Sequence, residues 1–177
     1  QTAANGESTN TTITSTPTAI PWGTLAAGTA KVARQDVTVA TNATNGYKVT
    51  LQFDQPLTST ASDTIDFFKD GNNQASSTAW ATPSNTLDTP TTYGHMRFTS
   101  DDADIGTNQG STVDFGVALY AGNATSSHIV MDHTGPADGT TANKGAAKIG
   151  FKIQIAALQE SGDSYTAALT YIVTPTF

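Results

Sequence analysis

The stretch NGYKVTLQFD (residues 45–54) decides the fold class, because its apolar side chains recur at every second position. In an extended chain, alternate side chains point to opposite faces of a sheet. One face would then be apolar and the other polar. The apolar face would carry Tyr47, Val49, Leu51 and Phe53. This pattern predicts a β-strand with one buried face.

The same alternation returns in AKVARQDVTVAT (30–41), AKIGFKIQIAAL (147–158) and SYTAALTYIVTPTF (164–177). Turn-forming residues separate these segments in pairs, at TNATNG (41–46) and at ALQESGDSY (157–165). Such residues between two strands are typical of a β-hairpin. We therefore expect one hairpin from 30–41 with 45–54 and a second from 147–158 with 164–177.

Further strands are expected at 93–99, 111–122 and 126–133, whereas helix signals barely appear. About eight alternating strands indicate an all-β protein, an antiparallel two-sheet sandwich of the Ig-like or jelly-roll kind. At 177 residues the chain suits one domain. We expect an extended N-terminal arm (1–20) and a sandwich (21–177). A long polar excursion is expected at about 54–92, in which 64–71 forms a short strand or a helical turn.

Composition narrows the function class. Hydroxyl residues are abundant, with 33 Thr and 13 Ser, and only 13% of residues are charged. Threonine favours the half-buried surface of a sheet. The net charge of -7 argues against a nucleic-acid partner and against an anionic membrane surface, since no basic stripe is present. There is no cysteine, and no apolar run is long enough to span a bilayer. With Gln1 in place of an initiator Met, these features favour an exported protein at the cell surface, after signal-peptide removal.

Catalytic patterns are weak. The chain has three histidines and two glutamates, and it lacks both the G-x-S-x-G motif and a cysteine nucleophile. His95 lies within a strand pattern, and Asp132-His133 lies at the end of another. Glycosidases need two carboxylates at a set separation. Most of the 13 aspartates instead lie in turns, where they cap the backbone. We expect neither an enzyme nor a cofactor.

The densest acidic cluster is SDDADIG (100–106), with Asp101, Asp102 and Asp104. Oxygen ligands at this spacing could hold Ca²⁺, but the EF-hand loop pattern is not matched. A solvated turn is the favoured interpretation, and we expect no metal.

Several surface features leave alternatives open. Sequons at Asn10, Asn42 and Asn123 are about as many as chance would supply, although all three positions are expected to be exposed as glycan attachment sites. Trp80 lies in a polar loop and is expected to be exposed, so it could stack on a sugar ring. Lys48 and Lys152 alternate with apolar residues, so both are expected to point to solvent. That direction argues against an isopeptide staple at either lysine.

Longer motifs resemble a known group. The motifs are GTLAAGT (23–29), TNATNGYKVT (41–50), MDHTGPADGTTANKGAAKIGFKIQI (131–155) and YTAALTYIVTPTF (165–177). They resemble secreted bacterial surface proteins, and the layout is similar to TasA/camelysin-type fibre proteins, archaeal bundling pili and spore-coat-U or fimbrial subunits. The resemblance implies a sandwich that polymerises by donating a β-strand to its neighbour. The chain differs from fimbrial subunits because it has no cysteine and so lacks the disulfide that is common in them.

The N-terminal residues QTAANGESTNTTITST (1–16) fit that role physically. They contain one aliphatic side chain larger than alanine, and such a segment cannot offset the entropy of ordering itself. Its β-propensity is high, and an exposed sheet edge would accept it as a strand. The predicted donor strand is Thr11, Thr12, Ile13, Thr14 and Ser15.

We therefore expect a structural subunit of an extracellular filament or pilus, whose partners are identical subunits in a homopolymer. The alternative is a monomeric cell-surface adhesive or carbohydrate-binding module, which would bind surface glycans.

Overall fold

The strand predicted at 45–54 is present as β3 (Tyr47–Phe53) in the computed structural model of the chain. Its burial alternates as the pattern predicts. The four apolar side chains are at most 6% exposed, and the polar residues between them are half-buried. The structure describes residues 5–10, 13–72, 74, 76–105, 115–122 and 125–177.

The chain is all-β, as predicted. In the described residues the only helical element is one 3₁₀ turn, η1 (Pro90–Thr92), and there is no α-helix. The other strands are β1 (Lys31–Thr38), β2 (Ala40–Thr41), β4 (Leu57–Thr58), β5 (Thr64–Phe67), β6 (Thr78–Ala79), β7 (Gly94–Ser100), β8 (Leu119–Tyr120), β9 (His128–His133), β10 (Ala137–Asp138), β11 (Ala146–Ile155) and β12 (Leu169–Pro175).

The strands form a curled five-stranded sheet in the order β1-β11-β7-β5-β4 and a three-stranded sheet in the order β12-β3-β9. Two small sheets pair β10 with β2 and β6 with β8. β5 runs parallel to β7, so the expectation of a purely antiparallel arrangement is wrong at this pair. The connection from β5 to β7 spans residues 68–93, which is long enough to return the chain to the starting end of the neighbouring strand.

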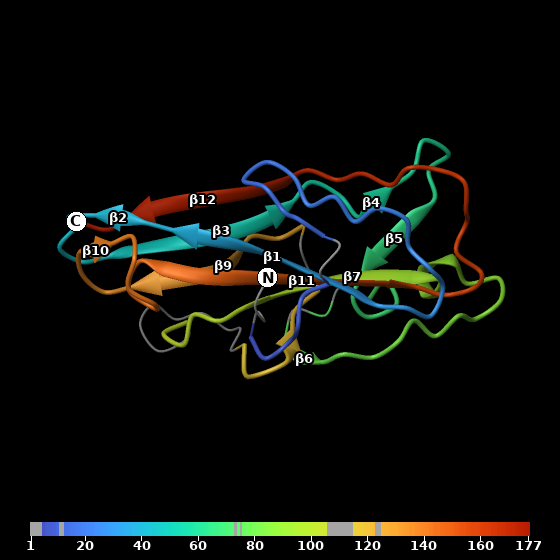
Figure 1. Ribbon diagram of the computed structural model, residues 1–177, viewed down its shortest axis with the longest axis horizontal. Coiled ribbons are helices and arrows are strands. Elements are labelled where there is room, and N and C mark those ends of the chain that lie inside the picture. The colour runs from blue at the N-terminus through green and yellow to red at the C-terminus, as the bar shows by residue number, and fades with distance from the viewer. Residues whose placement is uncertain (1–4, 11–12, 73, 75, 106–114, 123–124) are drawn as a thin grey trace.

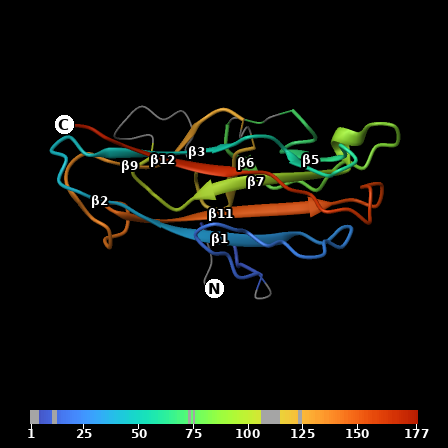
Figure 2. The same ribbon diagram turned by 90° about the horizontal axis from the view of Figure 1, so that it is seen from above.

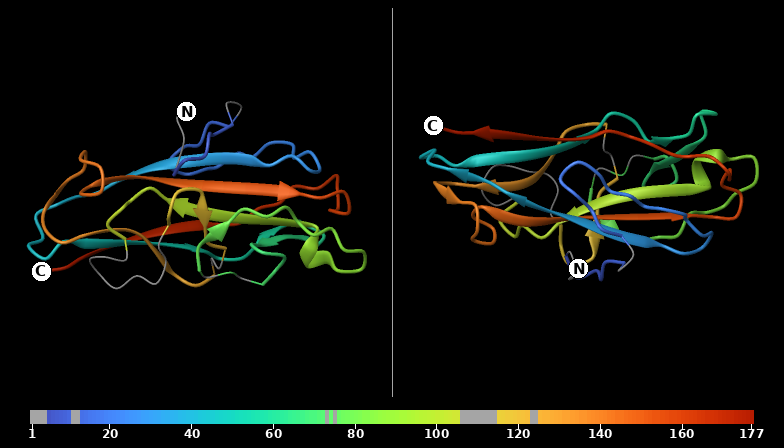
Figure 3. Two further views of the ribbon diagram at one scale, coloured as in Figure 1. Left: turned by 90° about the horizontal axis from the view of Figure 1, so that it is seen from below. Right: turned by 45° about the horizontal axis from the view of Figure 1, so that its top comes forward.

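The two larger sheets lie in separate layers (Figures 2 and 3). β3 and β12 form one layer, and β1 and β11 lie in the other. The main core lies between them, where the ring of Phe53 in β3 meets the ring of Phe151 in β11 edge to face, with centroids 6.3 Å apart. Phe53 also contacts Phe67 of β5, at 5.9 Å between centroids.

Both predicted hairpins are wrong. β1 pairs with β11 rather than with β3, and β12 pairs with β3 rather than with β11. In each predicted pair, the two strands lie in different sheets and the connection arches from one layer to the other. Turn-forming residues permit either connection, and burial of an apolar face on each strand is satisfied in both.

β9 contains an irregularity opposite Val49 and Thr50 of β3, where one residue, Val130, is extra. Such a bulge changes which side chains face the core. Val130 and the adjacent Met131 are both fully buried as a result. The Val130 carbonyl accepts a hydrogen bond from Ser100 Oγ of β7 at 2.6 Å, which ties the two sheets together here.

The expected polar excursion at 54–92 contributes to the core. It carries β4, β5 and β6, and its segment 64–71 begins as a strand. Ile65, Phe67 and Phe68 from this region are at most 3% exposed. The strand pattern here is only four residues long, which is why the polar residues around it dominate the sequence signal.

Replacing Phe151 with alanine removes a fully buried ring from the contact between the two layers. We expect Phe151→Ala to lower the free energy of unfolding by about 3–5 kcal/mol, as buried aromatic truncations do. Chemical denaturation measures this. Phe177→Ala is the matched control, because Phe177 is 81% exposed and its truncation should change stability by less than about 0.5 kcal/mol. Equal effects of the two variants would contradict the assigned core.

Candidate functional site

An apolar cavity of about 1060 Å³ lies between the five-stranded and three-stranded sheets. We call it the edge groove. Core side chains form its floor: Phe53, Leu57, Ile65, Met96, Ile153 and Ile155. Its rim consists of residues 17–25 and 159–169. A cavity of this size lined by core side chains can hold several apolar side chains of another segment.

One side of the edge groove is bounded by β12, which is the end strand of its sheet. Within the described residues no strand pairs with the outer edge of β12. The strand sequence LTYIVTP has no charged residue, and Ile172 and Val173 are 49% and 48% exposed. Natural edge strands are usually protected by charges or by a covering segment. This edge is therefore able to accept another strand.

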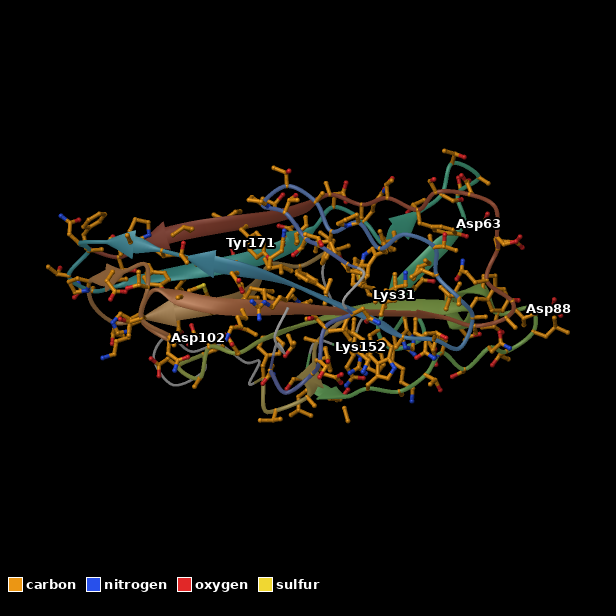
Figure 4. The ribbon with its side chains drawn as sticks, viewed as in Figure 1. Lys31, Asp63, Asp88, Asp102, Lys152 and Tyr171 are labelled. Atoms are coloured by element: carbon orange, nitrogen blue, oxygen red, sulfur yellow. The ribbon has the colours of Figure 1, made fainter. Side chains whose placement is uncertain are left out.

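Tyr171 joins β12 to the opposite wall of the groove (Figure 4). Its hydroxyl donates to Gln35 Oε1 of β1 at 3.0 Å. Burial raises the pKa of Tyr171 above its ordinary value, so the phenol keeps its proton. The bond fixes the separation of the two sheet edges.

The N-terminal segment, defined here as the described residues between 5 and 25, lies along the free edge of β1, and its residues 17–25 reach the rim of the edge groove (Figure 1). Asn10 binds the outer edge of β1 twice: its amide donates to the Val32 carbonyl at 2.9 Å, and its Oδ1 accepts from the Val32 amide at 2.5 Å. Farther along, Ser15 Oγ donates to the Arg34 carbonyl, and Gln35 Nε2 donates to the Thr16 carbonyl at 2.8 Å. Ile20, Trp22 and Leu25 then pack against the core.

Ile13 of the predicted donor strand is 2% exposed within its own chain, outside the main core cluster. Thr14 is exposed and Ser15 is half-buried. Thr11 and Thr12 lie outside the described residues. The one apolar side chain of the arm is thus covered in the isolated chain, and its binding to a neighbouring subunit stays a prediction.

Trp80 is not the exposed platform that the sequence predicts. Its indole stacks on Phe68, with centroids 5.8 Å apart, and contacts Tyr120 and His95 edge-on. Its Nε1 donates to Gln154 Oε1 at 3.0 Å. The local sequence is polar, but the loop folds back over the outer face of β7 and β11 and half-buries the ring. The face of the indole that stacks on Phe68 is not open to a ligand. Sugar binding at Trp80 stays a prediction.

The same outer face buries Arg97 of β7, which is 1% exposed and lies over the ring of Phe68. Its Nη1 donates to the Thr78 carbonyl at 2.6 Å. Burial lowers the pKa of Arg97 to about 8. Sequence reasoning missed this cluster, although Arg97 alternates with the apolar positions 96 and 98 of the strand.

The structure places His95 in β7 and the pair Asp132-His133 in β9. His95 is fully buried, its Nδ1 lies 3.3 Å from Asp70 Oδ1, and its Nε2 contacts the Ala81 carbonyl at 2.9 Å. Burial lowers the pKa of His95, which favours the neutral ring. Asp132 is fully buried in β9, and His133 is half-buried at its end. His95 holds the loop after β5 in place rather than facing an open cleft.

The acidic cluster is not the expected solvated turn. Asp102 is 4% exposed, and its carboxylate accepts backbone bonds from Asp104 at 3.0 Å and from Asp132 at 3.1 Å. Asp101 instead accepts from the Lys148 amide. Burial, with a smaller contribution from the nearby charges of Asp132 and Asp104, raises the pKa of Asp102 to about 7. In the described part of the chain, no three acidic or histidine side chains are grouped as metal ligands would be.

Two further expectations on the surface are corrected. Lys152 does not point to solvent: it is 8% exposed and its Nζ lies 2.8 Å from Glu7 Oε1. Lys48 is half-buried in β3. Among the sequons, Asn42 is exposed, Asn10 is half-buried against β1, and Asn123 lies outside the described residues.

Comparisons with known proteins identify no relative. No protein-family model, curated protein or solved structure matches the chain. No helix in the described residues is long and apolar enough to cross a membrane.

The raised pKa of Asp102 predicts how stability depends on pH. A carboxyl whose pKa is higher in the folded state than in the unfolded state stabilises the fold when protonated, and this contribution is lost as pH rises from about 4 through about 7. Asp102→Asn stays neutral, so its melting temperature should fall less than that of the wild type between pH 5 and pH 8. Asp88→Asn, at an exposed loop position, is the control and should follow the wild type. Identical profiles for Asp102→Asn and wild type would contradict the assignment.

Truncating Trp80 removes a stacked ring and a hydrogen bond. We expect Trp80→Ala to lower the free energy of unfolding by about 2–3 kcal/mol, less than for a fully buried ring. Leu87→Ala is the control, since Leu87 is 70% exposed. Denaturation curves report the difference. A variant as stable as wild type would show that the ring is a surface feature.

Proposed function

We propose that the chain is a structural subunit of an extracellular filament or pilus, which polymerises head-to-tail by exchange of its N-terminal segment. The observation that carries this proposal is the edge groove. It is floored by core side chains and bounded by β12, an uncharged strand whose outer edge pairs with no strand in the described part of the chain. The chain's own residues 17–25 form part of its rim. In this proposal the two facing layers act as a sandwich of the Ig-like or jelly-roll kind that is completed by an added strand.

The charge distribution supports strand addition between identical subunits. Residues 8–30 contain no charged residue, and neither do residues 164–177, which include β12. Both stretches line the edge groove, so they approach each other there without desolvating a charge. Each ladder hydrogen bond would contribute about 0.5–1.5 kcal/mol. Burial of Ile13, worth roughly 1.5–3 kcal/mol, is present in the closed chain and would be restored in the neighbouring subunit after exchange.

The position of the N-terminal segment in the isolated chain fits a closed monomer. A segment that is exchanged between identical subunits remakes in its neighbour the contacts that it makes in its own chain. Residues 26–29 offer a hinge, because Thr29 closes a turn on Ala26 and Gly28 has a φ of 75°. With Gly in this left-handed region the chain can open here at little steric cost.

The resulting contact is heterologous, because the N-terminal segment of one subunit binds the groove side of another. Such contacts generate open filaments unless the rotation closes a ring. Catalysis, a cofactor and a nucleic-acid partner have no part in this proposal. An extracellular or cell-surface location is the one that a filament of this kind requires.

Ile13→Asp tests the filament directly. It places a carboxylate where the segment must bury an apolar side chain, and an unpaired buried charge costs several kcal/mol or is neutralised by a large pKa shift. We expect filaments of wild type in negatively stained electron micrographs and only globular particles of the variant. Ile13→Val is the matched control and should still assemble.

Assembly of Ile13→Asp as efficiently as wild type would exclude the segment as the polymerising element. A complementary measurement uses the chain without residues 1–16. A peptide spanning residues 10–18 should raise the melting temperature of this truncated chain, because it binds only the folded state. Globular wild-type particles under all conditions would instead favour the alternative, a monomeric surface module.

A further inference from the structure

Glu7 enters a pocket on the outer face of the five-stranded sheet. Its carboxylate lies 2.8 Å from Lys152 Nζ, and the side chains of Glu7 and Lys152 are only 24% and 11% exposed. The ammonium of Lys152 lies 5.0 Å from the centroid of Trp80 and 5.7 Å from that of Tyr120. We call this the Lys152 pocket. An ion pair in such partly dry, aromatic surroundings contributes more than one in open solvent.

Two cations share the Lys152 pocket with one carboxylate, that of Glu7. Arg97 lies 5.7 Å from the centroid of the same Tyr120 ring, and in the described residues no carboxylate forms an ion pair with it. The hydroxyl of Tyr120 is buried there and interacts with the Glu7 carboxylate. Burial raises the pKa of Tyr120, and the negative charge of Glu7 raises it further, so the phenol stays a potential donor to that carboxylate.

Glu7 is also the only charged residue among the first 30. Residues 8–16 of the N-terminal segment are Ser, Thr and Asn apart from one isoleucine, and strands of that kind specify their register weakly. Slippage along β1 by two residues would break the side-chain bonds that Asn10 and Ser15 make with β1. It would also withdraw Glu7 from Lys152, which leaves a buried ammonium unpaired.

The backbone around Glu7 is shaped to bring it into the pocket. Asn5 Nδ2 donates to Thr99 Oγ1 at 2.6 Å and to the Gly116 carbonyl at 3.0 Å. Gly6 has a φ of 81°, and a Cβ atom there would lie 2.6 Å from a methyl group of Val117. Three residues after Glu7, Asn10 begins the contact with β1. The ion pair and the β1 contact are thus held at a fixed spacing.

We propose that Glu7 is the residue that sets the register of the N-terminal segment, by docking its carboxylate in the Lys152 pocket. It does so within its own chain. A second part of the proposal rests on the proposed function. After exchange, Glu7 docks in the same pocket of the neighbouring subunit, which is a second copy of this chain. The ion pair then fixes the position at which the segment docks, while the uncharged contacts supply most of the binding.

The closed monomer provides the first test. Glu7→Gln keeps the shape of the side chain and removes its charge. We expect the amide of Asn10, which is bonded to β1, to exchange its hydrogen on the order of tenfold faster than in wild type. The double variant Glu7→Lys/Lys152→Glu should restore the wild-type rate. Lys144→Glu, at an exposed position, is the charge-matched control and should not change it. An unchanged Asn10 rate in Glu7→Gln would overturn the proposal.

Mixing variants in polymerisation provides the second test. Glu7→Lys alone and Lys152→Glu alone should form few filaments, because like charges meet in the pocket. A mixture of the two should polymerise, since each segment then finds an opposite charge in the other subunit. A mixture of Glu7→Lys with Lys144→Glu should give no more filaments than Lys144→Glu gives alone, because the segment of Glu7→Lys meets Lys152 in both subunits.

The outcomes separate the two ideas. Absence of wild-type filaments would remove the proposed function, and the exchange rate of Asn10 would still decide the role of Glu7. Wild-type filaments together with equally efficient assembly of Glu7→Lys would overturn the role of Glu7 and leave the filament standing. Residue 7 lies outside the core, so Glu7→Lys is expected to fold. Its assembly can therefore be measured even where Lys152→Glu fails to fold.

Discussion

The burial of β11 on both faces is the constraint on which the rest of the structure depends. One face packs Phe151 and its neighbours against the three-stranded sheet. The other face carries Lys152 and Gln154, and it is covered by the Trp80 loop and by Glu7 of the N-terminal segment. Because this cover includes a segment that is exchangeable, removing that segment would uncover a charged pocket as well as an apolar groove.

The pairing surfaces of the proposed filament differ from ordinary sheet edges in lacking charge. Edge strands generally resist unwanted pairing through lysines, prolines or bulges. β12 has only Pro175, at its far end, and the N-terminal segment has one charged residue, Glu7, and two prolines, Pro17 and Pro21. Affinity on such a surface comes from backbone bonds and apolar burial, which are not selective. One ion pair in a partly buried pocket can then supply selectivity, because a charge that loses its partner costs more free energy than a threonine that is shifted.

The candidate site was only partly predictable from the chain. The polar composition of residues 1–16 and the isolated Ile13 led to the prediction that the N-terminal segment is a binding element. The alternation of β11 placed Lys152 correctly on the face opposite Phe151, but it could not show that a loop and Glu7 cover that face. Of the residues that cover this face, Trp80 lies more than 70 positions from Lys152 along the chain and Glu7 lies 145 positions from it. No local sequence pattern carries such information.

The sequence by itself predicted the strands β1, β3, β7, β9, β11 and β12, and it predicted which face of β3 and of β11 meets the core. Period-two alternation is a local property, and it needs no knowledge of a partner strand. Only the tertiary structure decided which strands pair, where both expected hairpins became connections between layers and β5 joined β7 in parallel. The physical reason is that a turn such as TNATNG reverses the chain without specifying whether the next strand continues the same sheet or crosses the core. That choice depends on how all the apolar faces are buried together.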